Sequence, residues 1–314
     1  MKKIVVVPEA IQGKTIIISV SGGKDSTATM LAVREAGLEA RYVFSDTGWE
    51  AKETYAHLDV LRKEIGPIDV VGVEGGMLGM IRGRSGFPAR MQRWCTRELK
   101  IDPLREYHDK IVDETGTDTI SVVGIRAEES QRRADMPVFG FDDTWNGYIW
   151  RPLMDWSVEE VLAVHHRHNI PIHPLYEAGF SRVGCWPCIF SNKEEIRLLA
   201  AYAPERIEEI AALEQEMELQ RAERNKERPG RYTQLDATFF QTKDGVSPMH
   251  IHEIVKWSQH AKGLPILAPP TGGCYRWGVC EPAQADEYFK EKEHEAEQFA
   301  AQAELSQEAD DKGR

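Results

Sequence analysis

A short string near the start of the chain combines the groups that bind a phosphate: Ser21-Gly22-Gly23-Lys24-Asp25-Ser26, followed by Thr27. Its two glycines let the backbone approach an anion closely, and the first N–H groups of a following helix would point toward that anion. Lys24 supplies a positive charge, and Asp25 could reach a bound metal ion or order the loop. We expect Ser26 and Thr27 to cap the helix with their hydroxyls. The string therefore predicts a nucleotide phosphate loop.

Such a loop needs a strand before it and a helix after it. Residues 16–20 are apolar and β-branched, which favours a buried strand, and residues 27–36 have helical character. Further strands are expected over 40–44, 69–73 and 119–123, with a helix over 51–65. This alternation predicts an α/β fold with a doubly wound parallel sheet.

Polar residues follow two of the other predicted strands. Asp46 ends the second strand, where an acidic residue often contacts a ribose or base, although it could instead cap the helix that begins at Ala51. Gly124 follows the strand over 119–123 and opens a charged run that continues to Arg133. We expect these residues to gather with the phosphate loop at one edge of the sheet.

The rest of the chain is read mainly as loops and helices. Residues 74–90 are rich in Gly and Arg and predict a long loop, which could act as a lid. A helix should begin at Ser157, and we interpret His165, His166 and His168 as part of a solvated face. Helical stretches are expected over 192–227 and 247–260. The predicted domains are an α/β domain over 1–180, a helical cysteine-bearing domain over 181–282 and an acidic helical or disordered tail over 283–314.

Composition limits the classes of function. With 314 residues, 41% of them hydrophobic, and no apolar run near the roughly 18 residues of a spanning helix, we expect a cytoplasmic protein without a membrane partner. A net charge of −12 argues against nonspecific coating of nucleic acid. A local basic segment could still attract DNA or tRNA phosphates or a sulfate-bearing nucleotide, unless it is simply a solvated face. It contains Arg82, Arg84, Arg90, Arg93, Arg97, Lys100 and Arg105.

The five cysteines suggest a metal site rather than disulfides, because the cytosol keeps thiols reduced. Cys185 and Cys188 form a Cys-x-x-Cys pair, and Cys274 and Cys280 form a second pair. By ligand count, four thiolates suit zinc or an iron–sulfur cluster equally, while Cys185 and Cys188 alone could be a redox dithiol. A structural zinc site remains the simpler alternative.

Cys95 stands apart from both pairs and allows three interpretations. It could be a nucleophile or sulfur carrier whose pKa is lowered by Arg93, Arg97 and Lys100. It could instead replace Cys274 or Cys280 as a metal ligand. The third interpretation is a half-buried free cysteine behind Trp94.

Five segments in order carry a family resemblance: Ser21–Ser26, Asp46–Gly48, Trp94–Lys100 with Pro103 and Leu104, Gly124–Ser130 with Arg133, and Arg151–Leu153 with Trp156. Over about residues 14–190 they resemble the phosphoadenosine phosphosulfate (PAPS) reductase family, within the PP-loop ATP pyrophosphatases of HUP-like fold. The phosphate loop is intact and the sequence holds no Glu-Cys-Gly-x-His motif. The resemblance is therefore closer to the DNA-phosphorothioation and phage-type branch than to the true sulfonucleotide reductases.

The resemblance implies an enzyme that binds ATP with Mg²⁺, adenylates an acceptor with release of pyrophosphate, and supports sulfur transfer through a [4Fe–4S] cluster. Lys24, Asp25, Arg126 and Cys95 would be catalytic. Arg97, Lys100, Arg132 and Arg133 would bind the α-phosphate or the acceptor. The acceptor could be DNA or tRNA, with a protein partner or sulfur donor. The alternatives are a PAPS or adenylyl-sulfate reductase, for which Cys95 would be a divergent nucleophile, and a nucleotide-binding subunit that acts only with a partner.

Overall fold

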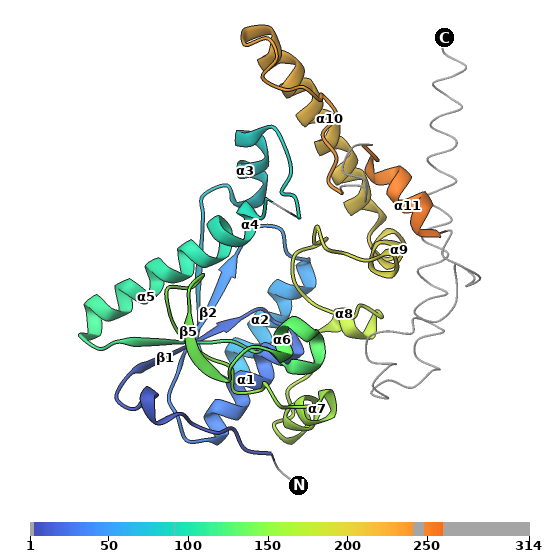
Figure 1. The fold of residues 1–314 in the computed structure, drawn as a ribbon. Helices are drawn as coiled ribbons and strands as arrows, with labels where there is room; N and C mark the ends of the chain where they lie inside the picture. The colour runs from blue at the N-terminus through green and yellow to red at the C-terminus, as the bar shows by residue number, and fades with distance from the viewer. Residues whose placement is uncertain (1–2, 91, 241–247, 260–314) are drawn as a thin grey trace. The chain divides into compact units, whose positions relative to one another are not determined.

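A six-stranded sheet forms the centre of the first part of the chain (Figure 1). The computed structural model describes residues 3–90, 92–240 and 248–259. The strand order is β3-β2-β1-β4-β6-β5, and every neighbouring pair is parallel except β5 with β6. The strands are β1 (Thr15–Val20), β2 (Arg41–Asp46), β3 (Ile68–Gly72), β4 (Thr119–Val122), β5 (Phe139–Asp142) and β6 (Gly147–Trp150).

Helices cover both faces of this sheet because successive residues of the central strand, which point to opposite faces, are apolar. Ile16 and Ile18 of β1 point into a core shared with α1 (Lys24–Glu35), α2 (Lys52–Glu64) and α7 (Val158–Arg167). Ile17, between them, packs on the opposite face against α5 (Asp102–Thr115). The predicted doubly wound α/β fold is confirmed.

Local sequence patterns predicted some of the helices and strands correctly and others not. The helix α7 is preceded by Ser157 as predicted, and Ser157 and Glu160 form a reciprocal capping box there. The loop predicted over 74–90 is wrong in part, because α3 (Gly76–Arg84) lies within it and buries Met77 and Ile81, one helical turn apart. The hairpin of β5 and β6 was missed, although Asn146, in the left-handed region at φ 55°, directly precedes Gly147.

Several short elements connect the longer ones. They are the 3-10 turns η1 (Glu9–Ile11) and η3 (Ala127–Glu129), the π turn η2 (Arg97–Ile101), and the helices α4 (Trp94–Thr96), α6 (Gln131–Ala134) and α8 (Pro174–Glu177). Within the described ranges, none of the helices is both long and apolar enough to cross a membrane.

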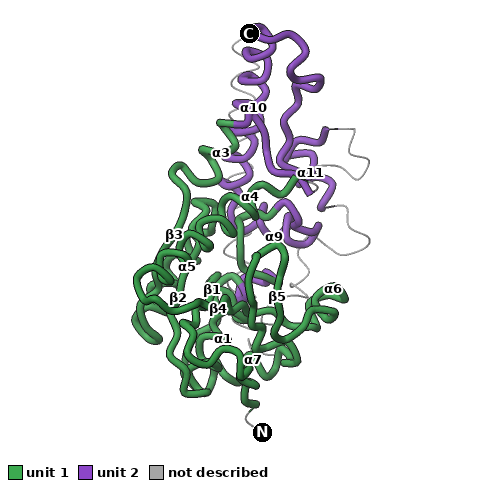
Figure 2. Tube along the Cα trace, turned by 60° about the vertical axis from the view of Figure 1, so that its left-hand side comes forward, with its two compact units in different colours: residues 1–83, 91–175, 182–188 green, residues 84–90, 176–181, 189–314 purple. Residues whose placement is uncertain are grey.

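The chain divides into two compact units, drawn in different colours in Figure 2. Unit 1 holds residues 1–83, 91–175 and 182–188, and unit 2 holds 84–90, 176–181 and 189–314. The described helices of unit 2 include α9 (Lys193–Tyr202), α10 (Pro204–Glu227) and α11 (Ile251–Gln259). The stretch expected to be helical over 192–227 is thus two helices, separated at Ala203 and followed by Pro204.

The segment 182–188 groups with unit 1, whereas the sequence assigned it to the helical domain. The reason is local bonding: the Trp186 N–H donates to the Trp49 carbonyl at 2.8 Å, and Cys185 forms an isolated antiparallel bridge with Glu50. The predicted tail over 283–314, like Cys274 and Cys280, lies outside the described residues.

Gly124 permits the end of β4 to lie directly against the start of α1. A Cβ atom at this position would stand 2.6 Å from the Asp25 carbonyl oxygen, and that oxygen belongs to backbone that cannot easily move. We expect Gly124→Ala to lower the free energy of unfolding by about 2 kcal/mol, measured by urea denaturation. Gly83→Ala is the control, since nothing lies within 4 Å of its added Cβ. Equal stability of the two variants would contradict this close approach.

Candidate functional site

The phosphate loop forms a closed turn between β1 and α1. Gly22 has φ +76°, a backbone conformation that favours glycine, and Gly23 is the N-cap residue of α1. The Gly23 N–H donates to Ser21 Oγ at 3.3 Å, and Ser26 Oγ donates to the Gly23 carbonyl at 3.0 Å. The hydroxyls therefore close the loop, and the prediction that they cap the helix is wrong. Thr27 Oγ1 is buried with no hydrogen-bond partner among the described residues.

Three charged side chains form a network at the start of α1. Lys24 Nζ lies 2.7 Å from Asp25 Oδ2, and Arg126 Nε lies 2.6 Å from Asp25 Oδ1. Lys24 and Arg126 are both buried. Burial opposes ionisation of Asp25, but the charges of Lys24 and Arg126 prevail and hold its pKa below the usual value. Asp25 is therefore a carboxylate that fixes two cations beside the loop.

The sheet order explains why these residues meet. β1 lies between β2 and β4, so the chain leaves β1 toward one side of the sheet and later returns on the other. Loops at the carboxyl ends of strands that flank such a switch point line a crevice. The phosphate loop follows β1 and Arg126 follows β4, which brings the two segments into contact. The expected gathering of Lys24, Asp25 and Gly124 at one edge is thus observed.

Asp46 lies at a cleft beside the end of β2. The cleft has a volume of about 320 Å³ and is lined by Asp46, Gly48, Val70, Val71, Gly72, Val73, Gly75 and Gly76. Asp46 Oδ1 accepts hydrogen bonds from the Gly48 N–H and the Tyr55 hydroxyl, both at 2.8 Å. The alternative role as a helix cap is wrong, because the N-cap residue of α2 is Ala51, without a side-chain cap. A small, half-polar cleft beside a carboxylate suits a nucleoside.

Buried histidines lie behind the phosphate loop, and the sequence interpretation missed them. His165 is buried rather than solvated, and its Nε2 lies 2.9 Å from the Lys24 carbonyl oxygen. A Cβ added at Gly22 would contact the ring carbons of both His57 and His173. His57 and His165 occupy the apolar face of their helices, so helical spacing was the signal that could have found them.

A second group of reactive side chains surrounds the Cys-x-x-Cys segment. Cys95, Cys185 and Cys188 are free and half-buried, and burial and the neighbouring thiols raise the pKa of Cys95 and of Cys185. Lys100 is hydrogen-bonded to Cys185, and its Nζ lies 4.0 Å from Glu50 Oε1. Cys95 stands apart from the Cys185–Cys188 pair in the sequence, but the structure brings it close to that pair.

The predicted activation of Cys95 is wrong for the metal-free thiol. Burial and the neighbouring Cys185 raise the pKa of Cys95, and Arg93 offsets this only partly. The Arg97 side chain is 76% exposed and has its Nε 3.8 Å from Asp102. Arg97 therefore interacts with a carboxylate at the surface rather than activating the thiol.

The remaining predicted substrate-binding residues lie near the surface. Arg132 is exposed on α6, and Arg133 is half-buried and forms an ion pair with Glu129. The basic segment between Arg82 and Arg105 is divided between the two units, with residues 84–90 in unit 2 and the others in unit 1. Substrate binding by Arg97, Lys100, Arg132 and Arg133 stays a prediction.

Several known proteins are similar to this chain. The family model of the phosphoadenosine phosphosulfate reductase domain matches residues 15–191. An uncharacterised 37.8 kDa protein of Escherichia phage 186 is 34% identical over 251 residues, which cover 63% of this chain and 74% of the phage protein. The adenosine 5'-phosphosulfate reductase of Allochromatium vinosum is 28% identical over 182 residues, covering 55% of this chain and 68% of the reductase. Phosphoadenylyl-sulfate reductase of Candida auris covers 57% of this chain and 84% of its own, with 16% identity and a TM-score of 0.43.

The buried histidines should make stability depend on pH. Burial and the neighbouring His165 lower the pKa of His57 from 6.5 to about 4. In this pH range His57 is protonated in the unfolded chain but not in the folded chain. The free energy of unfolding therefore falls as the pH drops from about 6.5 to about 4. The loss is on the order of 3 kcal/mol. In urea denaturation at several pH values, His57→Leu should reduce this slope, while exposed His166→Leu should keep it. An unchanged slope in His57→Leu would contradict the assignment.

Proposed function

Because the chain belongs to the phosphoadenosine phosphosulfate reductase family, we propose that it is an ATP pyrophosphatase of this family that adenylates an acceptor and supports iron–sulfur-dependent sulfur transfer. The observation that carries the proposal is the network of Lys24, Asp25 and Arg126 at the start of α1. It combines two buried cations, a glycine-rich turn and a helix N-terminus in one place. This combination suits a polyphosphate with more charge than a single sulfate ester.

ATP would bind with its β- and γ-phosphates at the phosphate loop. Backbone N–H groups around Gly22 and Gly23 and the first turn of α1 would receive the phosphate oxygens. The adenosine end would occupy the cleft beside Asp46, which follows the adjacent strand β2. Placing both ends of the nucleotide at the carboxyl edge of the sheet agrees with the position of ligands in open α/β sheets.

In the adenylation step, an oxygen of the acceptor would attack the α-phosphorus of ATP. The bond from that phosphorus to the bridging oxygen breaks, giving an adenylated acceptor and pyrophosphate. Lys24 would offset the charge that develops on the leaving pyrophosphate. Arg126 is held by Asp25 at 2.6 Å and by Glu128 at 2.5 Å, so it would act from a fixed position at the α-phosphate.

Mg²⁺ fits this site as part of the substrate. Both carboxylate oxygens of Asp25 are engaged, one by Lys24 and the other by Arg126. Asp25 therefore orders the loop, and the ion would enter on the phosphates of MgATP. Bound there, Mg²⁺ would supply further neutralisation of phosphate charge.

The group of Cys95, Cys185 and Cys188 fits a thiolate-bound cluster or zinc. These three half-buried thiols interact with one another electrostatically, and the adjacent Lys100 supplies a positive charge that favours thiolates. A fourth ligand would come from Cys274 or Cys280, which lie outside the described residues. A [4Fe–4S] cluster bound there would supply sulfur or electrons, whereas zinc would only hold the segment in place.

The alternative is a reductase acting on a sulfonucleotide. It is supported by the Allochromatium vinosum relative, whose name is adenosine 5'-phosphosulfate reductase. Turnover of adenylyl sulfate or PAPS without ATP consumption would favour this alternative. Binding of ATP without any turnover would instead favour a subunit that needs a protein partner. DNA and tRNA remain the proposed classes of acceptor.

The loop is tested by pyrophosphate release from ATP. Lys24→Ala should lower kcat/KM by about 100-fold or more, because it removes a charge that acts on the leaving group. Lys110→Ala is the matched control, since that lysine is 68% exposed on α5 and pairs with Glu114. Pyrophosphate release equal to that of wild type in Lys24→Ala would refute the proposed role of the loop.

The thiol site is tested by the content of iron, zinc and acid-labile sulfide in protein purified without oxygen. We expect iron with matching sulfide in the wild type, and loss of the metal in Cys95→Ser, Cys185→Ser and Cys188→Ser. Zinc without sulfide would make the site structural and remove the sulfur-transfer part of the proposal. Full metal retention in Cys95→Ser would show that Cys95 is not a ligand.

A further inference from the structure

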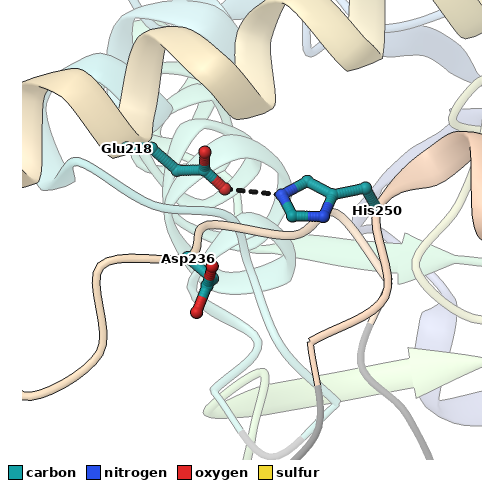
Figure 3. Close-up of side chains that lie close together, drawn as sticks. All are labelled: Glu218, Asp236 and His250. Carbon is teal, nitrogen blue, oxygen red and sulfur yellow. Dashed lines mark hydrogen bonds and ion pairs between the residues drawn. The ribbon is translucent and has the colours of Figure 1, made fainter.

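We propose that Glu218, Asp236 and His250 form a binding site for one divalent transition-metal ion in unit 2, separate from the thiols and from the phosphate loop. Each side chain offers one ligand atom, and these atoms all lie within 4.8 Å of one another. Glu218 comes from α10, Asp236 from the segment after it, and His250 directly precedes α11. Figure 3 shows Glu218 and His250 pointing toward each other, with Asp236 beside the pair.

The donor set selects the class of ion. Two carboxylates and one imidazole suit Zn²⁺, Mn²⁺ or Fe²⁺, whereas Ca²⁺ and Mg²⁺ prefer oxygen ligands alone. The three residues contain no thiolate, so this chemistry differs from that of the cysteine group. Water could complete the coordination, because Asp236 is exposed and His250 is only half-buried.

The two ring nitrogens of His250 face different carboxylates. Nε2 lies 2.6 Å from Glu218 Oε1, on the side of the proposed ion. Nδ1 lies 3.9 Å from Glu253 Oε2, and the same oxygen accepts the His250 backbone N–H at 3.0 Å. A carboxylate that accepts a hydrogen bond from the far nitrogen orients histidines bound to metals, and Glu253 lies within ion-pair distance of that nitrogen. Glu253 would therefore be the positioning residue for His250.

Hydrogen bonds between glutamate side chains of α10 and nearby backbone N–H groups already hold the segments that carry the three ligands. Glu214, one helical turn before Glu218, is buried, and its two oxygens accept the N–H groups of Phe239 at 2.8 Å and Ile251 at 2.9 Å. Glu218 Oε1 also accepts the Ala237 N–H at 3.2 Å. The same face of α10 thus fixes the chain next to Asp236 and next to His250. A bound ion would gain from ligands that need little further ordering.

The charge around the site is negative. Its carboxylates are Glu214, Glu218, Asp236 and Glu253, and Arg221 is a cation in their vicinity. The Arg221 guanidinium is directed to backbone, since it donates to the carbonyl oxygens of Ser85, Gln234 and Asp236. Its hydrogen bonds within the described residues thus go to backbone rather than to the Glu218 and Asp236 carboxylates, with which it interacts only through its charge. The proposed ion would link α10, the segment containing Asp236 and the start of α11.

The test uses the full chain without nucleotide, titrated with Mn²⁺ and followed by electron paramagnetic resonance of the free ion. Mn²⁺ is chosen because thiolates bind it poorly, which keeps the cysteines from competing. We expect Asp236→Asn and His250→Gln to weaken binding about 100-fold, and Glu253→Gln about 10-fold. His252→Gln is the matched control, because His252 is an exposed neighbour that faces Glu208 at 3.5 Å. It should bind Mn²⁺ like the wild type.

Asp236→Asn is the decisive variant, since the exposed Asp236 side chain can be changed without disturbing the core. Without Mn²⁺ its melting temperature should equal that of the wild type, and only the wild type should be stabilised when the ion is added. Equal Mn²⁺ affinity in wild type and Asp236→Asn, or no binding by either, would overturn the proposal and leave an ion pair between His250 and Glu218. Pyrophosphate release by the variant should be unchanged, so the result is independent of the proposed activity.

Discussion

The ion pair between Asp25 and Arg126 is the constraint on which the rest of the site depends. The two residues are 101 positions apart and come from the ends of different strands, yet their side chains meet at 2.6 Å. A buried guanidinium without this carboxylate would cost several kcal/mol, so the pair requires β1 and β4 to be neighbours. Lys24 forms an ion pair with the same carboxylate, so the phosphate loop is linked through Asp25 to the segment that follows β4.

Packing around this pair leaves little freedom. Gly124 has no side chain because the backbone of Asp25 occupies that space. On the other side, His165 contacts the Lys24 carbonyl oxygen and His173 lies behind Gly22. Burial lowers the pKa of both histidines, so their rings are neutral at neutral pH and pack beside the charged loop without adding charge. The backbone that carries the N–H groups of the loop is thus held by its contacts with His165 and His173.

The sequence was most informative where a local pattern decides the structure. The alternation of β-branched runs and helices predicted the sheet, and Ser157 marked the start of α7 correctly. The loop residues from Ser21 to Ser26 could be recognised because their order is set by one turn. Local patterns could not show that His165 faces Lys24, or that Cys95 lies near Cys185, since these contacts depend on segments far apart in the chain. The hairpin of β5 and β6 was missed because its strands have four residues each.

The turn after β2 belongs to two sites at once. Asp46 lines the cleft, while Glu50, four positions later, faces Lys100 and pairs through its backbone with Cys185. Thr47 and Trp49 both donate to the Glu50 carboxylate, and the Trp49 indole donates to the Pro187 carbonyl. The same short turn therefore carries a carboxylate of the cleft and the backbone that pairs with the thiol segment. A ligand that displaced Asp46 would also displace the backbone that pairs with Cys185, and binding at the cleft would then be reciprocally linked to the geometry of the thiols.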